Sequence, residues 1–227
     1  MTGAAAPLPL NGAALVADLT GALWWPEAAL LAFADLHLEK GSSYAPRGTL
    51  LPPYDTRTTL ARMADAIARY RPRSVVCLGD SFHDDGAAAR LDDGDALVLR
   101  RLVDGRDWLW IAGNHDPKPP DGPGGRSVAE YVAGPLRFRH EAVFMTAPGE
   151  VSGHFHPKAS VSHRGRRVTG RCFASDGRRL VLPAFGAYAG GLSVRDPAVA
   201  SLFPDGFAVW LLGRSRVHMF PAARLSA

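Results

Sequence analysis

Three short apolar runs of this chain end at polar residues whose side chains can bind metal ions. The runs are ALLAFAD (residues 29–35), SVVCLGD (74–80) and WLWIAGNHD (108–116). Apolar runs of this length, rich in β-branched and aromatic residues, are typical of buried strands. Because a buried sheet is rigid, the loops at its strand ends hold their side chains in fixed positions. The pattern therefore favours a sheet whose strand ends converge on one site.

Strands and helices alternate through the first half of the chain. Strands are predicted at residues 13–19, 21–26, 29–35, 74–79 and 108–113, and helices over Asp55–Tyr70 and near residues 95–103. In the first helix, Leu60, Met63 and Ile67 form an apolar stripe, and Asp55 is the expected N-cap. This alternation favours an α/β sheet that contains parallel strands.

The second half contains short β-rich segments separated by glycine, Asp-Gly and proline. These segments are residues 142–147, 149–154, 158–163, 166–175, 178–185 and 207–213. Asp176-Gly177 predicts a tight hairpin, and the Pro/Gly-rich residues 118–125 predict a flexible loop. We expect two packed β-sheets with helices outside. No shift in composition divides the chain, so we expect a single domain over residues 1–227.

The composition of the chain indicates its cellular compartment and excludes some classes of protein. The chain is 47% hydrophobic and 21% charged, which is ordinary for a globular protein. Cys77 and Cys172 lie in apolar segments, which predicts two buried free thiols. The first basic residue is Lys40, so a signal peptide is not expected, and we predict a cytoplasmic protein. No uncharged apolar run reaches the roughly 18 residues of a membrane span.

The polar segments supply a set of oxygen and nitrogen donors that suits two cations. The candidate ligands are Asp35, His37, Asp80, Asn114, His140, His154 and His156. Residues i and i+2 of a strand share a face. The side chains of Asp35 and His37 are therefore expected to point to the same side, and so are those of His154 and His156. Taken singly, each histidine is more often a hydrogen-bonded structural residue, and only the joint order indicates a metal centre. The donors favour Mn, Fe, Zn, Co or Ni over Cu(I), and the histidines argue against Ca and Mg alone.

The order of these motifs is similar to that of a known superfamily. DLH, GDSFHD, GNHD, a lone His and GHFH resemble the calcineurin-like metallophosphoesterases over residues 13–215. The segments ADLHLEKG, LPPYDT, GNHDP, GHFHP and PAFGAYAGG also resemble the ligase-associated DNA-damage-response endonucleases, the PdeM-like branch. The resemblance implies a four-layer α/β/β/α fold, in which two packed mixed β-sheets are flanked by helices.

The resemblance also implies a division of labour among the site residues. It assigns one metal ion to Asp35, His37, Asp80 and His156, and a second to Asp80, Asn114, His140 and His154. His115 matches the catalytic histidine that contacts the substrate phosphate or the leaving oxygen. Asp84 and Asp116 are candidates for orienting His83, His115 or a ligand. Two divalent ions are implied, Mn foremost, with Fe, Zn, Ni or Co as alternatives, and a hydroxide bridging them is expected to attack phosphorus in line.

The substrate is left open among three alternatives. We favour a phosphodiesterase or nuclease that acts on DNA in repair, with the repair helicase and ligase partners that the resemblance implies. The alternatives are an enzyme for small phosphate esters, such as cyclic nucleotides, and a non-catalytic scaffold. Residues 158–179 are strongly basic, opposed only by Asp176, and form either a solvated hairpin or a track for an anionic substrate. The predicted substrate contacts are Lys40, Arg166, Arg167 and Arg171.

Overall fold

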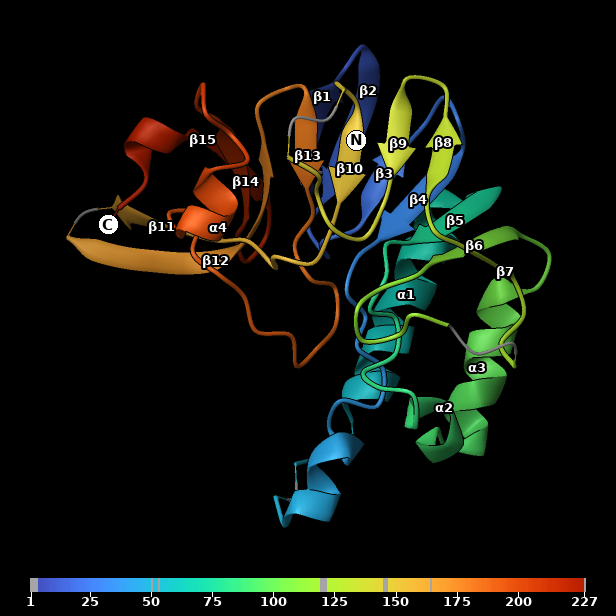
Figure 1. The fold of residues 1–227 in the computed structure, drawn as a ribbon. Coiled ribbons are helices and arrows are strands. Elements are labelled where there is room, and N and C mark those ends of the chain that lie inside the picture. The colour runs from blue at the N-terminus through green and yellow to red at the C-terminus, as the bar shows by residue number, and fades with distance from the viewer. Residues whose placement is uncertain are drawn as a thin grey trace.

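Two β-sheets pack face to face in the computed structural model, which describes residues 4–49, 51–52, 54–118, 122–144, 147–163 and 165–226 (Figure 1). The first sheet has the order β1 (Ala5–Leu10), β2 (Ala13–Asp18), β3 (Leu23–Trp25), β4 (Leu30–Phe33), β5 (Ser74–Cys77), β6 (Asp107–Ile111) and β7 (Arg126–Val128). Neighbouring strands are antiparallel from β1 to β4 and parallel from β4 to β7.

The second sheet is also mixed. Its order is β15 (Val217–Pro221), β14 (Ala208–Leu212), β12 (Arg166–Ser175), β13 (Arg179–Val181), β10 (Glu150–Ser152), β9 (Leu136–Phe138) and β8 (Tyr131–Ala133). Strand β11 (Lys158–His163) pairs with β12 outside this path. Strand β10 runs parallel to both β9 and β13. The carboxyl ends of β9 and β10 therefore lie at one edge of this sheet.

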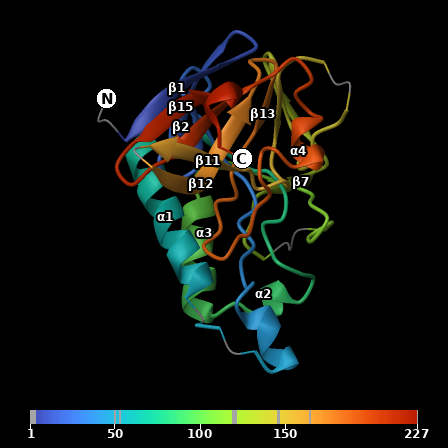
Figure 2. The same cartoon turned by 90° about the vertical axis from the view of Figure 1, so that its left-hand side faces the viewer.

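Helices cover the outer faces and complete four layers. They are α1 (Asp55–Tyr70), α2 (Ala87–Arg90), α3 (Asp93–Val103) and α4 (Pro197–Ala200), with 3₁₀ turns at Ser42–Arg47 and Ala222–Arg224. Helices α1 and α3 lie side by side against the first sheet (Figure 2), where Met63 and Leu99 pack with Trp108. Val199 of α4 packs against Val209 of the second sheet.

Apolar side chains from both sheets fill the space between them. Leu15 of the first sheet belongs to the same buried cluster as Phe138 and Phe173 of the second. Burying an apolar side chain of this size contributes about 1.5–3 kcal/mol, so this layer is the main stabilising core. The layered arrangement confirms the predicted α/β/β/α fold. None of the described helices is long and apolar enough to cross a lipid bilayer.

Most predicted elements are present, and several details differ. Helix α1 has the predicted bounds, but Tyr54 is its N-cap, and the Asp55 carboxylate instead accepts a hydrogen bond from Gly41 N at 2.8 Å. Residues 142–144 form no strand, and 145–146 lie outside the described residues, as do 119–121 of the predicted loop. The prediction of two buried free thiols is confirmed for Cys77 and Cys172.

Candidate metal centre

The candidate ligands lie in loops at the carboxyl ends of strands from both sheets. The loop after β4 carries Asp35 and His37, the loop after β5 carries Asp80, the loop after β6 carries Asn114, the segment after β9 carries His140, and the loop after β10 carries His154 and His156. Strands β4, β5 and β6 of the first sheet are parallel, and so are β9 and β10 of the second. The carboxyl ends within each set therefore meet at one edge of the sheet. The sheet order therefore brings together residues that are distant in sequence.

The ligand loops have a backbone conformation that the strand pattern did not predict. Asp35, His37, Asp80, His154 and His156 all have positive φ angles, between 44° and 69°. Positive φ is uncommon for residues with a side chain and costs free energy, so it is concentrated at functional sites. The expectation that Asp35 shares a strand face with His37, and His154 with His156, is wrong, because β4 ends at Phe33 and β10 ends at Ser152. A left-handed turn brings their side chains into the same site instead.

The first donor group consists of Asp35, His37 and His156. The Nε2 atoms of His37 and His156 lie 3.3 Å apart, and His156 Nε2 lies 3.4 Å from Asp35 Oδ1. Asp35 and His37 are buried, and His156 is half-buried. One donor atom from each residue lies within 4.8 Å of the other two. This spacing places a carboxylate and two imidazoles around one point.

The second donor group consists of Asp80, Asn114, His140 and His154. The Asn114 Oδ1 atom lies 2.9 Å from His140 Nε2 and 3.0 Å from His154 Nδ1. His140 Nε2 also lies 3.1 Å from His154 Nδ1 and 3.5 Å from Asp80 Oδ1. Two imidazoles, a carboxylate and a neutral amide oxygen therefore converge on a second point.

Asp80 lies between the two groups. Its Oδ2 atom is 3.8 Å from His37 Nε2 of the first group, and its Oδ1 atom is 3.5 Å from His140 Nε2 of the second. Its Oδ1 also accepts a hydrogen bond from His115 N at 2.9 Å. A carboxylate that faces both groups is placed to contribute one oxygen to each of two adjacent cations.

The hydrogen-bond geometry of His140 fits a cation in the second group. His140 Nδ1 lies 2.9 Å from the carbonyl oxygen of Leu78, which only accepts hydrogen bonds, so Nδ1 carries the proton. In the neutral ring, Nε2 is then an acceptor facing the oxygens of Asn114 and Asp80. Acceptors that face one another across a buried site repel unless a cation lies between them. The donor set, all oxygen and nitrogen, suits a divalent transition metal.

His37 of the first group is held in the neutral form that binds metal. Burial, followed by the electrostatic effects of His156 and Lys40, lowers the pKa of His37 to about 2. A neutral imidazole offers a lone pair to a cation without first losing a proton.

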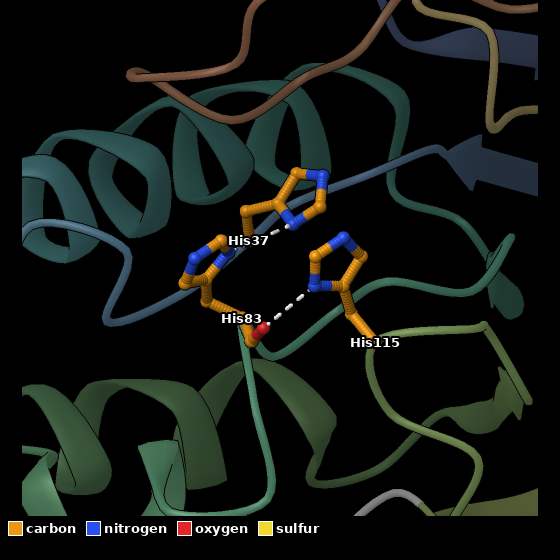
Figure 3. A group of neighbouring side chains, drawn as sticks. All are labelled: His37, His83 and His115. Carbon is orange, nitrogen blue, oxygen red and sulfur yellow. Dashed lines mark hydrogen bonds between the residues drawn. The ribbon is translucent and has the colours of Figure 1, made fainter. Parts of the chain in front are cut away.

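Three histidines, one of which is His37 of the first group, lie close together (Figure 3). His37, His83 and His115 offer nitrogen atoms within 4.8 Å of one another, and the rings of His83 and His115 are stacked with centroids 5.1 Å apart. His115 Nδ1 donates to the carbonyl oxygen of His83 at 2.9 Å. Because Nδ1 carries that proton, the exposed ring of His115 keeps Nε2 free for another partner. Sequence reasoning gave His83 no role of its own, although it lies in the GDSFHD motif.

The carboxylates of Asp116 and Asp84 have different surroundings. Asp116 is buried, and it accepts hydrogen bonds from Ser81 N at 2.8 Å, Phe82 N at 3.1 Å and Gly113 N at 3.2 Å. Burial raises the pKa of Asp116 to about 6. The hydrogen bonds of Asp116 tie the loop that carries Asp80 to the loop that carries Asn114.

Asp84 bonds to Arg90 Nη2 at 2.8 Å and to Gly86 N at 2.9 Å, and the hydrogen bond from Arg90 lowers its pKa. Among the described residues, its hydrogen bonds lead toward α2 and not to a candidate ligand.

Glycines next to the ligands are a feature that sequence reasoning did not use. A Cβ atom on Gly113 would lie 2.2 Å from Asp80 N, and one on Gly153 would lie 2.6 Å from Asp35 Oδ2. A Cβ on Gly79 would lie 2.5 Å from His140 Nδ1. Each of these glycines immediately precedes a ligand, in GD, GNHD and GHFH. They permit the close approach of loops from different strands.

The predicted substrate contacts are spread over a wider surface. Lys40 is half-buried and acts electrostatically on His37 and His83, which places it beside the first group. Arg166 and Arg167 are exposed near the turn of the β11–β12 hairpin, whose residues 166–171 pair only with β11 among the described strands. Arg171 lies opposite Lys158 at the base of the hairpin. At about 3.4 Å per residue, Arg166 is roughly 17 Å farther along the strand.

Comparison with known proteins places this site in a family. The model of the calcineurin-like phosphoesterase family matches residues 28–177. The crystal structure of Pseudomonas putida nuclease MPE superposes with a TM-score of 0.72 at 28% identity, and the match covers 96% of this chain and 99% of that one. Among curated proteins, none matches this chain. The chain belongs to the calcineurin-like phosphoesterase family and is a metal-dependent phosphoric ester hydrolase.

Proposed function

We propose that this protein is a binuclear-metal nuclease that hydrolyses phosphodiester bonds of DNA and serves in DNA repair. The observation that carries the proposal is the pair of adjacent donor groups with Asp80 between them. The similarity of this chain to a solved nuclease, over 96% of its length, supports nucleic acid as the class of substrate.

Each donor group would hold one divalent ion. Asp35, His37 and His156, with one oxygen of Asp80, would hold the first ion. Asn114, His140 and His154, with the other oxygen of Asp80, would hold the second. Two bound divalent ions lower the pKa of a shared water and neutralise charge on a phosphate ester. Mn²⁺ is our choice of ion, because the carboxylate and amide oxygens of the two groups suit it.

His115 is the residue we assign to proton transfer. Its Nδ1 proton is committed to the carbonyl oxygen of His83, which fixes the ring and leaves Nε2 on the side away from that carbonyl. A protonated Nε2 would donate to the oxygen that leaves phosphorus, and a positioned acid of this kind contributes about 10²–10⁴-fold to rate. The His115 backbone N–H is bonded to Asp80, so the ring is held close to the donor groups.

The surroundings of the centre support a polymeric, anionic substrate. The side chains of Asn114 and His115 are exposed, so the second group is open to solvent. Lys40 lies beside His37, Lys158 follows His156 by two residues, and the basic hairpin continues from Lys158. Cations along a path away from the centre would contact successive backbone phosphates of a nucleic acid.

Hydrolysis of a substrate panel after chelation and reconstitution with Mn²⁺ tests the proposal. The panel contains a phosphomonoester, a chromogenic phosphodiester, a cyclic nucleotide, single- and double-stranded DNA, and RNA. We expect Mn²⁺-dependent cleavage of DNA and of the chromogenic diester. Activity confined to the monoester or the cyclic nucleotide would replace the nuclease with an enzyme for small phosphate esters.

The His115→Ala variant separates catalysis from metal binding. We expect its bound metal, measured by elemental analysis, to equal that of the wild type while turnover of DNA falls by about 10²–10⁴. A parallel loss of metal would make His115 a ligand and would remove its assigned role in proton transfer.

A further inference from the structure

Two arginine side chains contact one short segment beside the centre, and neither forms an ion pair with another described residue. Arg62 of α1 lies with Cζ 4.5 Å from the centroid of the Phe185 ring, and its Nη2 donates to Thr20 O at 2.7 Å. Arg171 of β12 donates from Nη1 to Ala184 O at 2.6 Å. Both guanidinium groups therefore contact the same short segment, residues 184–185, although one comes from a helix and the other from a strand of the second sheet.

The two groups form an uncompensated positive site. Within the described ranges, neither arginine has a carboxylate within ion-pairing distance, and the side chains donate to backbone carbonyl oxygens. Burial lowers the pKa of both, that of Arg171 to about 10, and the charge of Arg62 adds to the effect on Arg171. Two like charges that are half-buried together are costly unless an anion binds. Both side chains keep partial exposure and several unused N–H donors.

This arginine pair is connected to the first donor group through the backbone of residues 184–186. Phe185 N donates to Ala34 O at 2.8 Å, and Gly186 N donates to Asp35 O at 3.1 Å. The segment that the arginines hold is therefore bonded to the backbone of a candidate ligand. Lys158 lies opposite Arg171 on β11, two residues after His156. A polynucleotide that leaves the centre past His156 would meet the arginine pair next.

We propose that Arg62 and Arg171 together bind one backbone phosphate of a nucleic-acid substrate, at a position separate from the metal centre. The inference rests on the proposed nuclease function and adds a binding site to it. Paired guanidinium groups match a phosphate, because each offers planar, parallel N–H donors that bond two phosphate oxygens. Arg62 is outside the basic stretch of residues 158–179, so only the fold unites it with Arg171.

Binding of a fluorescein-labelled 20-nucleotide oligothymidylate to metal-free protein tests this site without cleavage. We expect the Arg62→Gln/Arg171→Gln variant to bind about tenfold more weakly than the wild type. The slope of log K against log salt should fall by about 0.7, the value for one phosphate contact on a single strand. With Mn²⁺, the ratio of kcat/KM for the oligonucleotide to kcat/KM for a chromogenic diester should also fall about tenfold.

A matched control and a conservative variant separate binding from folding. Arg57→Gln removes the same charge from the same helix, but Arg57 pairs with Asp95, so its affinity should match the wild type. Arg62→Lys/Arg171→Lys keeps both charges and should retain most of the affinity that the Gln variant loses. An equal loss of oligonucleotide affinity in the Arg57→Gln variant would refute a specific site. Unchanged affinity and salt slope in the Arg62→Gln/Arg171→Gln variant would also refute it.

Two further outcomes distinguish the failure of this inference from that of the proposed function. A parallel fall in oligonucleotide and diester turnover, with a lowered melting temperature, would give the arginines a structural role and overturn the site. Wild-type protein that hydrolyses the diester but neither binds nor cuts DNA would overturn both the site and the nuclease function. DNA cleavage with normal binding by the Gln pair would remove the arginine site alone.

Discussion

His140 Nδ1 lies 2.9 Å from the carbonyl oxygen of Leu78, so a residue of the second sheet is oriented by the backbone of the first. Leu78 follows β5 and comes two residues before Asp80, whereas His140 follows β9. The bond fixes the tautomer of His140 and directs Nε2 at Asn114 and Asp80. The geometry of the second donor group therefore depends on the relative position of the two sheets.

Replacing His140 with alanine should remove this bridge and one metal ligand. We expect His140→Ala to retain about one Mn²⁺ per chain where the wild type retains two, and to lose at least about 100-fold in turnover. Elemental analysis after Mn²⁺ loading and desalting measures the first effect. Full retention of two ions would show that the second group does not depend on His140.

Asp116 and Asp84 should respond differently to substitution, because their hydrogen bonds lead to different places. Asp116→Ala removes the acceptor that ties Ser81 and Phe82 to Gly113, and we expect Mn²⁺ affinity to fall by about 10–100-fold. Asp84→Ala, which loses its pairing with Arg90, should change the affinity by less than about threefold. Calorimetric titration with Mn²⁺ compares the two. Similar affinities in both variants would remove the positioning role of Asp116.

Gly113 should not tolerate a methyl group. Its Cβ would lie 2.2 Å from Asp80 N, so Gly113→Ala must displace the Asp80 loop. Overpacking of this kind costs about 1–3 kcal/mol, and we expect urea unfolding to show it together with reduced Mn²⁺ binding. Gly190→Ala is the control, because a Cβ there meets no atom within 4 Å and its φ is not positive. Equal stability of the two variants would contradict the predicted clash.

The sequence predicts where the site residues lie but not how the backbone presents them. The apolar runs before Asp35, Asp80 and Asn114 are true strands, and parallel pairing explains why their ends converge. The positive φ angles of Asp35 and His37 depend on tertiary packing, so a strand-face argument gave the right neighbours for the wrong reason. Sequence order likewise does not show that Asp84 would pair with Arg90.

Elements were missed where local preference and tertiary structure disagree. Strand β1 contains Pro7 and Pro9, which argue against a strand, yet proline is tolerated there because β1 is at the edge of its sheet. Strands β8 and β9 have only three residues each, too few for an alternating pattern to be detected. Arg62 was overlooked because its neighbour Arg171 is more than a hundred residues away in sequence.

Chelation should destabilise the whole protein and not only stop hydrolysis, because the acceptors of both donor groups repel one another when no cation separates them. Saturating Mn²⁺ at about 100 times its dissociation constant adds about 2.7 kcal/mol per site. For a domain of this size, that corresponds to a rise in melting temperature of about 5–10 °C per site over protein in EDTA, measured by scanning fluorimetry. The Asp80→Asn variant should show less than half of this rise, since Asp80 faces both groups. An equal rise in that variant would mean that the ions bind elsewhere, and the assignment of Asp80 as their shared ligand would be wrong.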